Sequence, residues 1–360
     1  MQRIAAVIVT LRVCAAALLV AVALVAVPDT YAATFTDLYR ITVDPVQGAA
    51  DPRRENIRAA MSRLLTRVTG RRDAGFDPDL ASLMENADDF VNQYGQDRQG
   101  RIRVDFNAGR LSQALAALNR PVWGPERPLT LLWVAFDNGL GERALLGAGD
   151  PAGAGLSREM TALLTSARDE LIRVADERGL PIAFPLLDVQ DLAAVGFADV
   201  WGGFEEPVRA ASERYAPDAI LIGRVRADDF GTDVQWLLLA AGERRLLAGS
   251  SVPEGLDWAA DLYASQYAVL GEGGTTRVTV LDVASFADYG RVMSYLESLS
   301  VLQSVDVEAL DGGVLSLRVT ARGDASVLER VLGLGGVLRR AERPGPPGTL
   351  LFEVERGTPQ

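Results

Sequence analysis

The sequence predicts a mixed α+β and α/β protein built from three small α/β sandwich units, the last of them ferredoxin-like. Amphipathic helical stripes alternate with short strand-like segments along the chain. A nearly unbroken apolar run at residues 129–136 (LTLLWVAF) is typical of a strand buried on both faces. After residue 275 the order strand, helix, strand, strand, helix, strand (βαββαβ) is that of a ferredoxin-like sandwich.

The first 32 residues predict a secretory signal peptide. Arg3 and Arg12 precede an apolar run at residues 13–27, and small residues follow at Ala32 and Ala33. The run is shorter than the roughly 20 residues that a membrane span needs. We therefore expect cleavage after Ala32, no stable membrane span afterwards and a periplasmic location. An uncleaved anchor is the alternative.

Residues 33–118 predict an N-terminal α+β unit. Apolar residues at helical spacing begin near Arg53, and Gly70 marks the end of that helix. A second stripe predicts a helix over residues 79–94, and alternation predicts strands over 34–43 and 101–106. A short helix is expected over 111–118.

Residues 119–128 (NRPVWGPERP) predict a linker between units, because proline and glycine at this density interrupt both helices and strands. Trp123 is expected to pack over an interface, with stacking on a ligand as the alternative. Trp123 and Arg127 are the candidate interaction surface of the chain.

Residues 129–271 predict a middle α/β unit. Strands are expected over 129–136, 182–187 and 219–225, with helices over 158–178 and 204–215 between them. A hairpin over 234–240 and 246–250 and a helix over 257–270 complete the unit, which therefore follows βαβ connectivity.

Residues 275–357 predict the C-terminal ferredoxin-like unit. The turn at Asp311-Gly312-Gly313 predicts a hairpin of strands over 301–310 and 314–321. Asp324 is expected to cap a helix, and residues 337–341 and 350–354 to close the sheet.

Composition excludes several kinds of chemistry. The chain has no histidine and no lysine, and its one cysteine is Cys14 in the predicted leader. Histidine-dependent triads, lysine Schiff bases, P-loops and thiol nucleophiles are therefore excluded. The net charge of −12 argues against nucleic-acid binding. We expect no cofactor and no metal.

Carboxylates are the remaining candidates for catalysis. Asp188 and Asp191 follow a predicted strand, where they could serve a hydrolase that uses carboxylates on cell-wall or glycan substrates. Capping of the next helix by Asp188 is the favoured interpretation. Asp228, Asp229 and Asp233 could hold calcium but lack EF-hand spacing.

Several segments resemble a known exported family. RRENIRAAMSRLLTRVTG, DFVNQYG, RIRVDF and VWGPERPLTLLWVAF are similar to Gram-negative domain-of-unknown-function family two thousand and sixty-six, over about residues 35–250. The resemblance implies an envelope location and no accepted catalytic residues. RYAPDAILIGRV makes the middle unit similar to the α/β domain of the Tol N-terminal part, curli lipoproteins and penicillin-binding-protein activators.

These observations favour a non-catalytic periplasmic protein, a scaffold that binds another envelope protein. A carboxylate-based hydrolase and a small-ligand-binding module are the alternatives. The sequence leaves the oligomeric state open.

Overall fold

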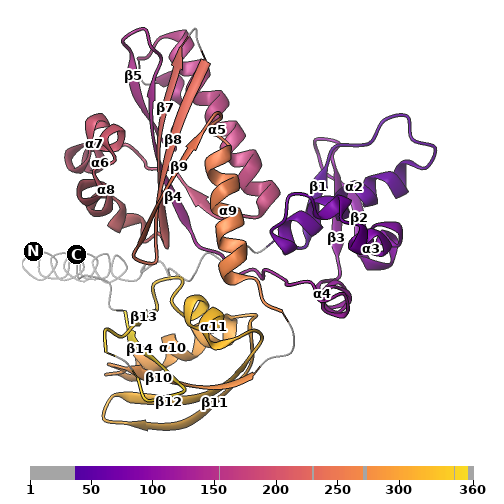
Figure 1. Ribbon diagram of the computed structural model, residues 1–360, viewed down its shortest axis with the longest axis vertical. Coiled ribbons are helices and arrows are strands. Elements are labelled where there is room, and N and C mark those ends of the chain that lie inside the picture. Colours follow the sequence, from indigo (N-terminus) through magenta and orange to yellow (C-terminus); the bar gives the residue numbers. More distant parts are fainter. Residues whose placement is uncertain (1–36, 154, 229–230, 271–273, 344, 356–360) are drawn as a thin grey trace, which may run out of the picture. The chain divides into compact units, whose positions relative to one another are not determined.

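The computed structural model describes residues 37–153, 155–228, 231–270, 274–343 and 345–355 (Figure 1). The predicted signal peptide, residues 1–32, lies outside this part of the chain. Among the described residues, none of the helices has the length and apolar character needed to cross a membrane. The fold is mixed α+β with three sheets, as the sequence predicts.

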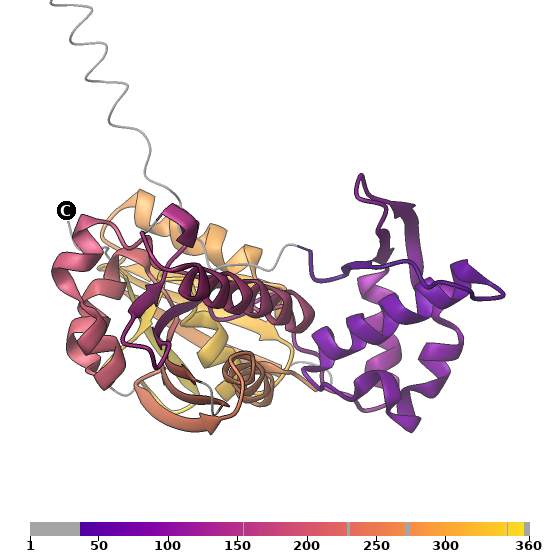
Figure 2. The ribbon, with the colours of Figure 1, turned by 90° about the horizontal axis from the view of Figure 1, so that it is seen from above.

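The first sheet belongs to the N-terminal unit and has the strand order β1-β3-β2. Its strands are β1 (Arg40–Val43), β2 (Val91–Gln96) and β3 (Ile102–Phe106), and both pairings are antiparallel. Figure 2 shows the helices of this unit gathered on one side of the sheet. They are α2 (Pro52–Thr69), α3 (Ala81–Glu85) and α4 (Ala108–Ala117).

Helix α2 has the boundaries that its sequence predicts. The Asp51 side chain accepts a hydrogen bond from the Arg54 amide at the start, and Gly70 ends the helix at φ 72°. The apolar stripe that includes Ile57, Met61 and Leu64 is fully buried in the core of the unit.

The predicted helix over residues 79–94 is broken into short pieces, with 3₁₀ turns at Pro78–Leu80 and Ala87–Phe90 on either side of α3, and it is wrong at residues 91–94. The α-helical part is α3, five residues long, and the Asn86 side chain donates to the carbonyl of Ser82 where it ends. Residues Val91–Gln96 form β2 instead, because β3 offers them a full antiparallel partner. Pairing across the sheet therefore overrides the local helical pattern.

The second sheet has the order β5-β4-β7-β8-β9, and a short strand, β6, also pairs with β4. The strands are β4 (Thr130–Asp137), β5 (Arg143–Leu146), β6 (Ile182–Ala183), β7 (Ala219–Asp228), β8 (Gly231–Ala240) and β9 (Glu243–Gly249). The pairs β4–β7 and β4–β6 are parallel. Of the predicted strand over residues 182–187, only Ile182 and Ala183 form a strand, β6.

Helices cover both faces of this middle sheet (Figure 1). Leu132, Val134 and Phe136 on β4 join the core that includes α5 (Arg158–Arg178) and α9 (Glu254–Tyr267). The intervening β4 residues pack on the opposite face with α7 (Phe197–Gly202) and α8 (Glu205–Ser212), and α6 (Val189–Ala194) lies against α8. The prediction that this strand is buried on both faces is confirmed.

The third sheet has the order β11-β12-β10-β14-β13. Along the chain the unit runs β10 (Gly274–Leu281), α10 (Phe286–Ser298), β11 (Leu302–Asp311), β12 (Val314–Ala321), α11 (Ala325–Leu332), β13 (Leu338–Arg340) and β14 (Thr349–Val354). The predicted βαββαβ-like elements are present. The chain departs from the simple pattern at its end, where β14 lies parallel to β10 and β13 takes the outer edge.

Candidate functional site

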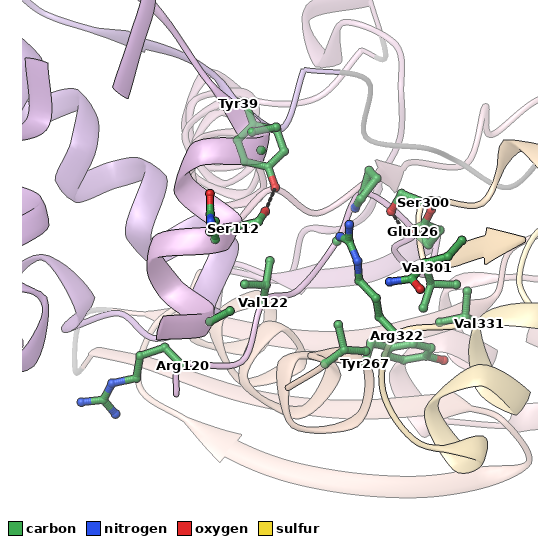
Figure 3. Close-up of a pocket in the computed structure, with 18 of the residues that line it drawn as sticks. Tyr39, Ser112, Arg120, Val122, Glu126, Tyr267, Ser300, Val301, Arg322 and Val331 are labelled. Atoms are coloured by element: carbon green, nitrogen blue, oxygen red, sulfur yellow. Dashed lines mark hydrogen bonds between the residues drawn. The ribbon is translucent and has the colours of Figure 1, made fainter. Parts of the chain in front are cut away.

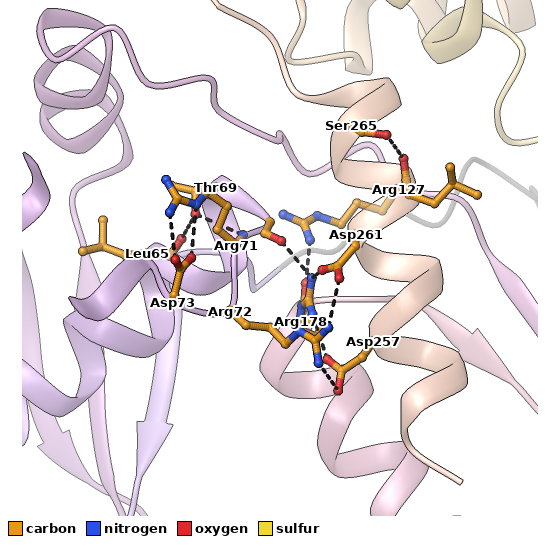
Figure 4. Close-up of polar contacts among 12 residues, drawn as sticks. Leu65, Thr69, Arg71, Arg72, Asp73, Arg127, Arg178, Asp257, Asp261 and Ser265 are labelled. Carbon is orange, nitrogen blue, oxygen red and sulfur yellow. Dashed lines mark hydrogen bonds and ion pairs between the residues drawn. The ribbon is translucent and has the colours of Figure 1, made fainter. Parts of the chain in front are cut away.

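Arg127 lies at a joint between segments that are far apart in the sequence (Figure 4). Its side chain is fully buried and stacks over Trp123, with the guanidinium carbon 3.9 Å from the ring centroid. The guanidinium donates five hydrogen bonds, all to backbone carbonyl oxygens: those of Gly124 (2.9 Å), Arg178 (2.8 Å), Gly179 (3.2 Å), Arg67 (2.7 Å) and Trp123 (3.1 Å).

These acceptors explain how a buried cation is tolerated without a carboxylate in contact. Arg67 lies in the last turn of α2, and Arg178 is the last residue of α5. Carbonyl groups at helix C-termini lack partners within the helix and carry partial negative charge. Burial and the nearby Arg67 charge lower the pKa of Arg127, whereas the five carbonyl bonds favour its protonated form.

Two further buried arginines complete the joint. Arg67 donates to the backbone carbonyl of Asp176 (2.6 Å) and to its carboxylate (3.1 Å), and burial lowers the Arg67 pKa to about 10. Arg178 donates to Asp257 (2.7 Å) and Asp261 (2.5 Å) on α9. The joint therefore ties the N-terminal unit to the middle unit.

The segment 119–128, predicted as a linker, is held on several sides. The Trp123 amide donates to the Val68 carbonyl at 2.7 Å, and Val122 forms a β-bridge with Val269. Trp123 and Arg127 are both 0% exposed. The two residues chosen as an interaction surface are therefore packing residues inside the chain, and their side chains offer no surface to a partner in this conformation.

Asp188 and Asp191 have structural partners. Asp188 caps α6, accepting from the amides of Gln190 and Asp191, and pairs with Arg214 at 2.8 Å. The bond from Arg214 and the backbone amides lower the Asp188 pKa. Asp191 is 1% exposed and accepts from the Leu187 amide (2.9 Å), the Tyr215 hydroxyl (2.5 Å) and Arg214 (3.1 Å).

The acidic loop offers no described metal centre. Asp229 lies outside the described residues, and Asp228 and Asp233 belong to β7 and β8. Among the side chains that the structure describes, no group of three acidic, histidine or cysteine residues is arranged to hold a metal ion.

A cavity of about 800 Å³ lies beside segment 119–128 (Figure 3). Residues 108–117 of α4 line one wall, residues 122–126 another, and residues 300–331 of the C-terminal unit a third. The remaining lining residues are Tyr39, Arg120, Tyr267 and Val269. Much of the lining is apolar: Ala108, Ala116, Ala117, Val122, Pro125, Val269, Val301 and Val331. This size and lining are typical of small-molecule sites.

Polar groups reach the cavity from separate elements. The Tyr39 hydroxyl lies 3.5 Å from that of Ser112. Glu126 is 5% exposed, and its carboxylate accepts bonds from the Ser300 amide and, at 2.9 Å, the Ser300 hydroxyl. Figure 3 shows Arg322 extending from the C-terminal unit into the cavity. Sequence reasoning missed this site, because no local spacing connects these segments.

The N-terminal part of the chain matches a family model. Residues 32–124 match the model of a family described as Domain of unknown function (DUF8605). The resemblance to family two thousand and sixty-six is therefore wrong, and the Tol-type likeness of the middle unit, part of the same assignment, is not kept. The RVTG motif, on which the resemblance partly rested, is the end of α2 at Gly70. Helices that end at a glycine occur in unrelated folds.

Other comparisons add little. No curated protein matches the chain. A solved structure of a competence-damaged protein (CinA) superfamily protein from Escherichia coli is 14% identical, over 43% of this chain and 83% of that one, with a TM-score of 0.18. A score this low supports no argument about fold or function.

Proposed function

We propose that this protein is an exported, non-catalytic binding protein that takes a small ligand into the cavity between α4, residues 122–126 and the C-terminal unit. The observation that carries the proposal is the cavity itself, about 800 Å³ with largely apolar walls and a few polar groups. The predicted signal peptide, in which arginines precede an apolar run, supports export to the periplasm.

The described contacts favour binding over catalysis. A general base or nucleophile needs a carboxylate free to meet a substrate. Asp191 is buried among three hydrogen-bond donors, and Asp188 is engaged as a helix cap and an ion-pair partner. In the cavity, both oxygens of Glu126 accept bonds from Ser300. The role as a scaffold for another envelope protein stays a prediction.

A neutral fluorescent dye tests the proposal on the purified exported protein. We expect N-phenyl-1-naphthylamine to bind one molecule per chain with enhanced, saturable fluorescence. Ala116→Trp places an indole in the cavity from α4 and should abolish this binding. Ala210→Trp makes the same change on an exposed position of α8 and should leave it intact.

Dye at 100 times its dissociation constant should also raise the unfolding free energy of the wild-type protein by about 2.7 kcal/mol. Equal dye binding by the wild type and Ala116→Trp would show that the cavity is not the binding site. Absence of saturable binding to the wild type would overturn the proposal.

A further inference from the structure

The charged side chains that line the cavity differ in whether they have partners within the protein. Arg120 lines the wall but pairs with Asp77 (3.1 Å) and Asp79 (2.5 Å). Glu126 has its two oxygens on Ser300. Arg322 differs, since among the described residues its guanidinium has no hydrogen bond or ion pair.

The position of Arg322 is set by its backbone contacts. It follows the last residue of β12, and its amide donates to the Val301 carbonyl at 2.9 Å. Figure 3 shows the side chain passing Tyr267 and Val331 and extending toward the region of Glu126 and the Tyr39–Ser112 pair. An exposed guanidinium therefore lines the cavity beside apolar side chains, with hydroxyl groups and the Glu126 carboxylate in the same cavity.

We propose that the ligand is a small apolar molecule carrying one carboxylate, which Arg322 binds while the alanine and valine walls hold the apolar part. This inference rests on the proposed function. A guanidinium presents a planar fork of donors that matches a carboxylate. A single free arginine, in a cavity that also holds the Glu126 carboxylate, matches a monoanion better than a phosphate monoester, which carries −1.5 to −2 at neutral pH.

Displacement of the bound dye tests the class of ligand. Decanoate has a flexible alkyl chain and 2-naphthoate a flat aromatic ring, and both carry a carboxylate. Decan-1-ol has an alkyl chain and a neutral hydroxyl group. We expect at least one carboxylate to displace the dye at a concentration tenfold or more below that needed for decan-1-ol. Which carboxylate binds more tightly identifies the form of the apolar part.

Variants at Arg322 separate charge from packing. Arg322→Gln should weaken carboxylate binding tenfold or more and leave decan-1-ol within about twofold, while Arg322→Lys should keep part of the preference. Arg98→Gln is the matched control, because Arg98 is another exposed arginine without a described side-chain partner, placed in the β2–β3 turn. It should bind like the wild type.

The outcomes distinguish the two proposals. If the dye binds in the cavity but carboxylates and decan-1-ol displace it equally, or Arg322→Gln changes nothing, the carboxylate inference is wrong and the binding function stands. If the dye fails to bind the wild type, the proposed function fails, and the carboxylate inference fails with it.

Discussion

Replacing Arg127 with methionine removes the centre of the buried joint. Five backbone oxygens lose their donor, at distances that are now 2.7–3.2 Å. A buried acceptor without a partner costs about 1–3 kcal/mol. Removing the guanidinium also removes the cost of burying a charge, which offsets part of the loss. We expect Arg127→Met to lower the unfolding free energy by about 3–5 kcal/mol, because the summed cost of several carbonyls without a donor exceeds the part that removal of the buried charge offsets.

Urea unfolding followed by circular dichroism measures this change, and limited proteolysis provides a second measurement. The segment 119–128 should become susceptible to cleavage in Arg127→Met, because Trp123 loses the cation stacked on its ring. Arg98→Met, at an exposed turn, should stay within about 0.5 kcal/mol of the wild type. A loss below about 1 kcal/mol in Arg127→Met, with the segment still protected, would refute the reasoning.

Four other substitutions test the fold. Asp191→Ala should cost about 2–3 kcal/mol in urea unfolding, because it leaves buried donors unpaired; an unchanged midpoint would contradict this. The lowered pKa of Asp188 means that its stabilisation is present above the ordinary value of 3.8 and is lost as pH falls through the folded value. The difference in melting temperature between wild type and Asp188→Asn should therefore shrink in acid, and a pH-independent difference would exclude this origin. Gly223→Ala should cost about 1–3 kcal/mol, since its methyl carbon would lie 2.4 Å from the Trp236 ring. Gly290→Ala, in α10 with open space around it, should be neutral or slightly stabilising by the same measurement.

Sequence patterns predicted the parts of the fold that depend on residues close together in the chain. The run at 129–136 predicted a strand with two buried faces, and β4 places alternate residues in separate cores. The position of Asp188 directly before a helical turn favoured a cap, and both cap bonds are present. In each case the residues that decide the structure are neighbours in the chain.

Predictions failed where distant segments decide the structure. Residues 91–94, the end of the predicted helix, become part of a strand through pairing with 102–106. Arg127 stood out only as part of a proline-rich segment, because its five acceptors come from three separate stretches of chain. The cavity has the same origin, since Tyr39, Glu126 and Arg322 meet only after folding.

The parallel pairing of β14 with β10 has a consequence for the order in which the C-terminal sheet is completed. Arg277 is paired with Thr349 and Leu281 with Glu353, so β10 is joined on one side by a strand made much later in synthesis. Until β14 is in place, that side of β10 has unpaired amide and carbonyl groups, the kind of edge that promotes aggregation. β13 cannot protect it, since β13 is itself paired only with β14. A chain cut short before Thr349 would thus leave open an edge in the interior of the native sheet, and that edge could pair with another chain.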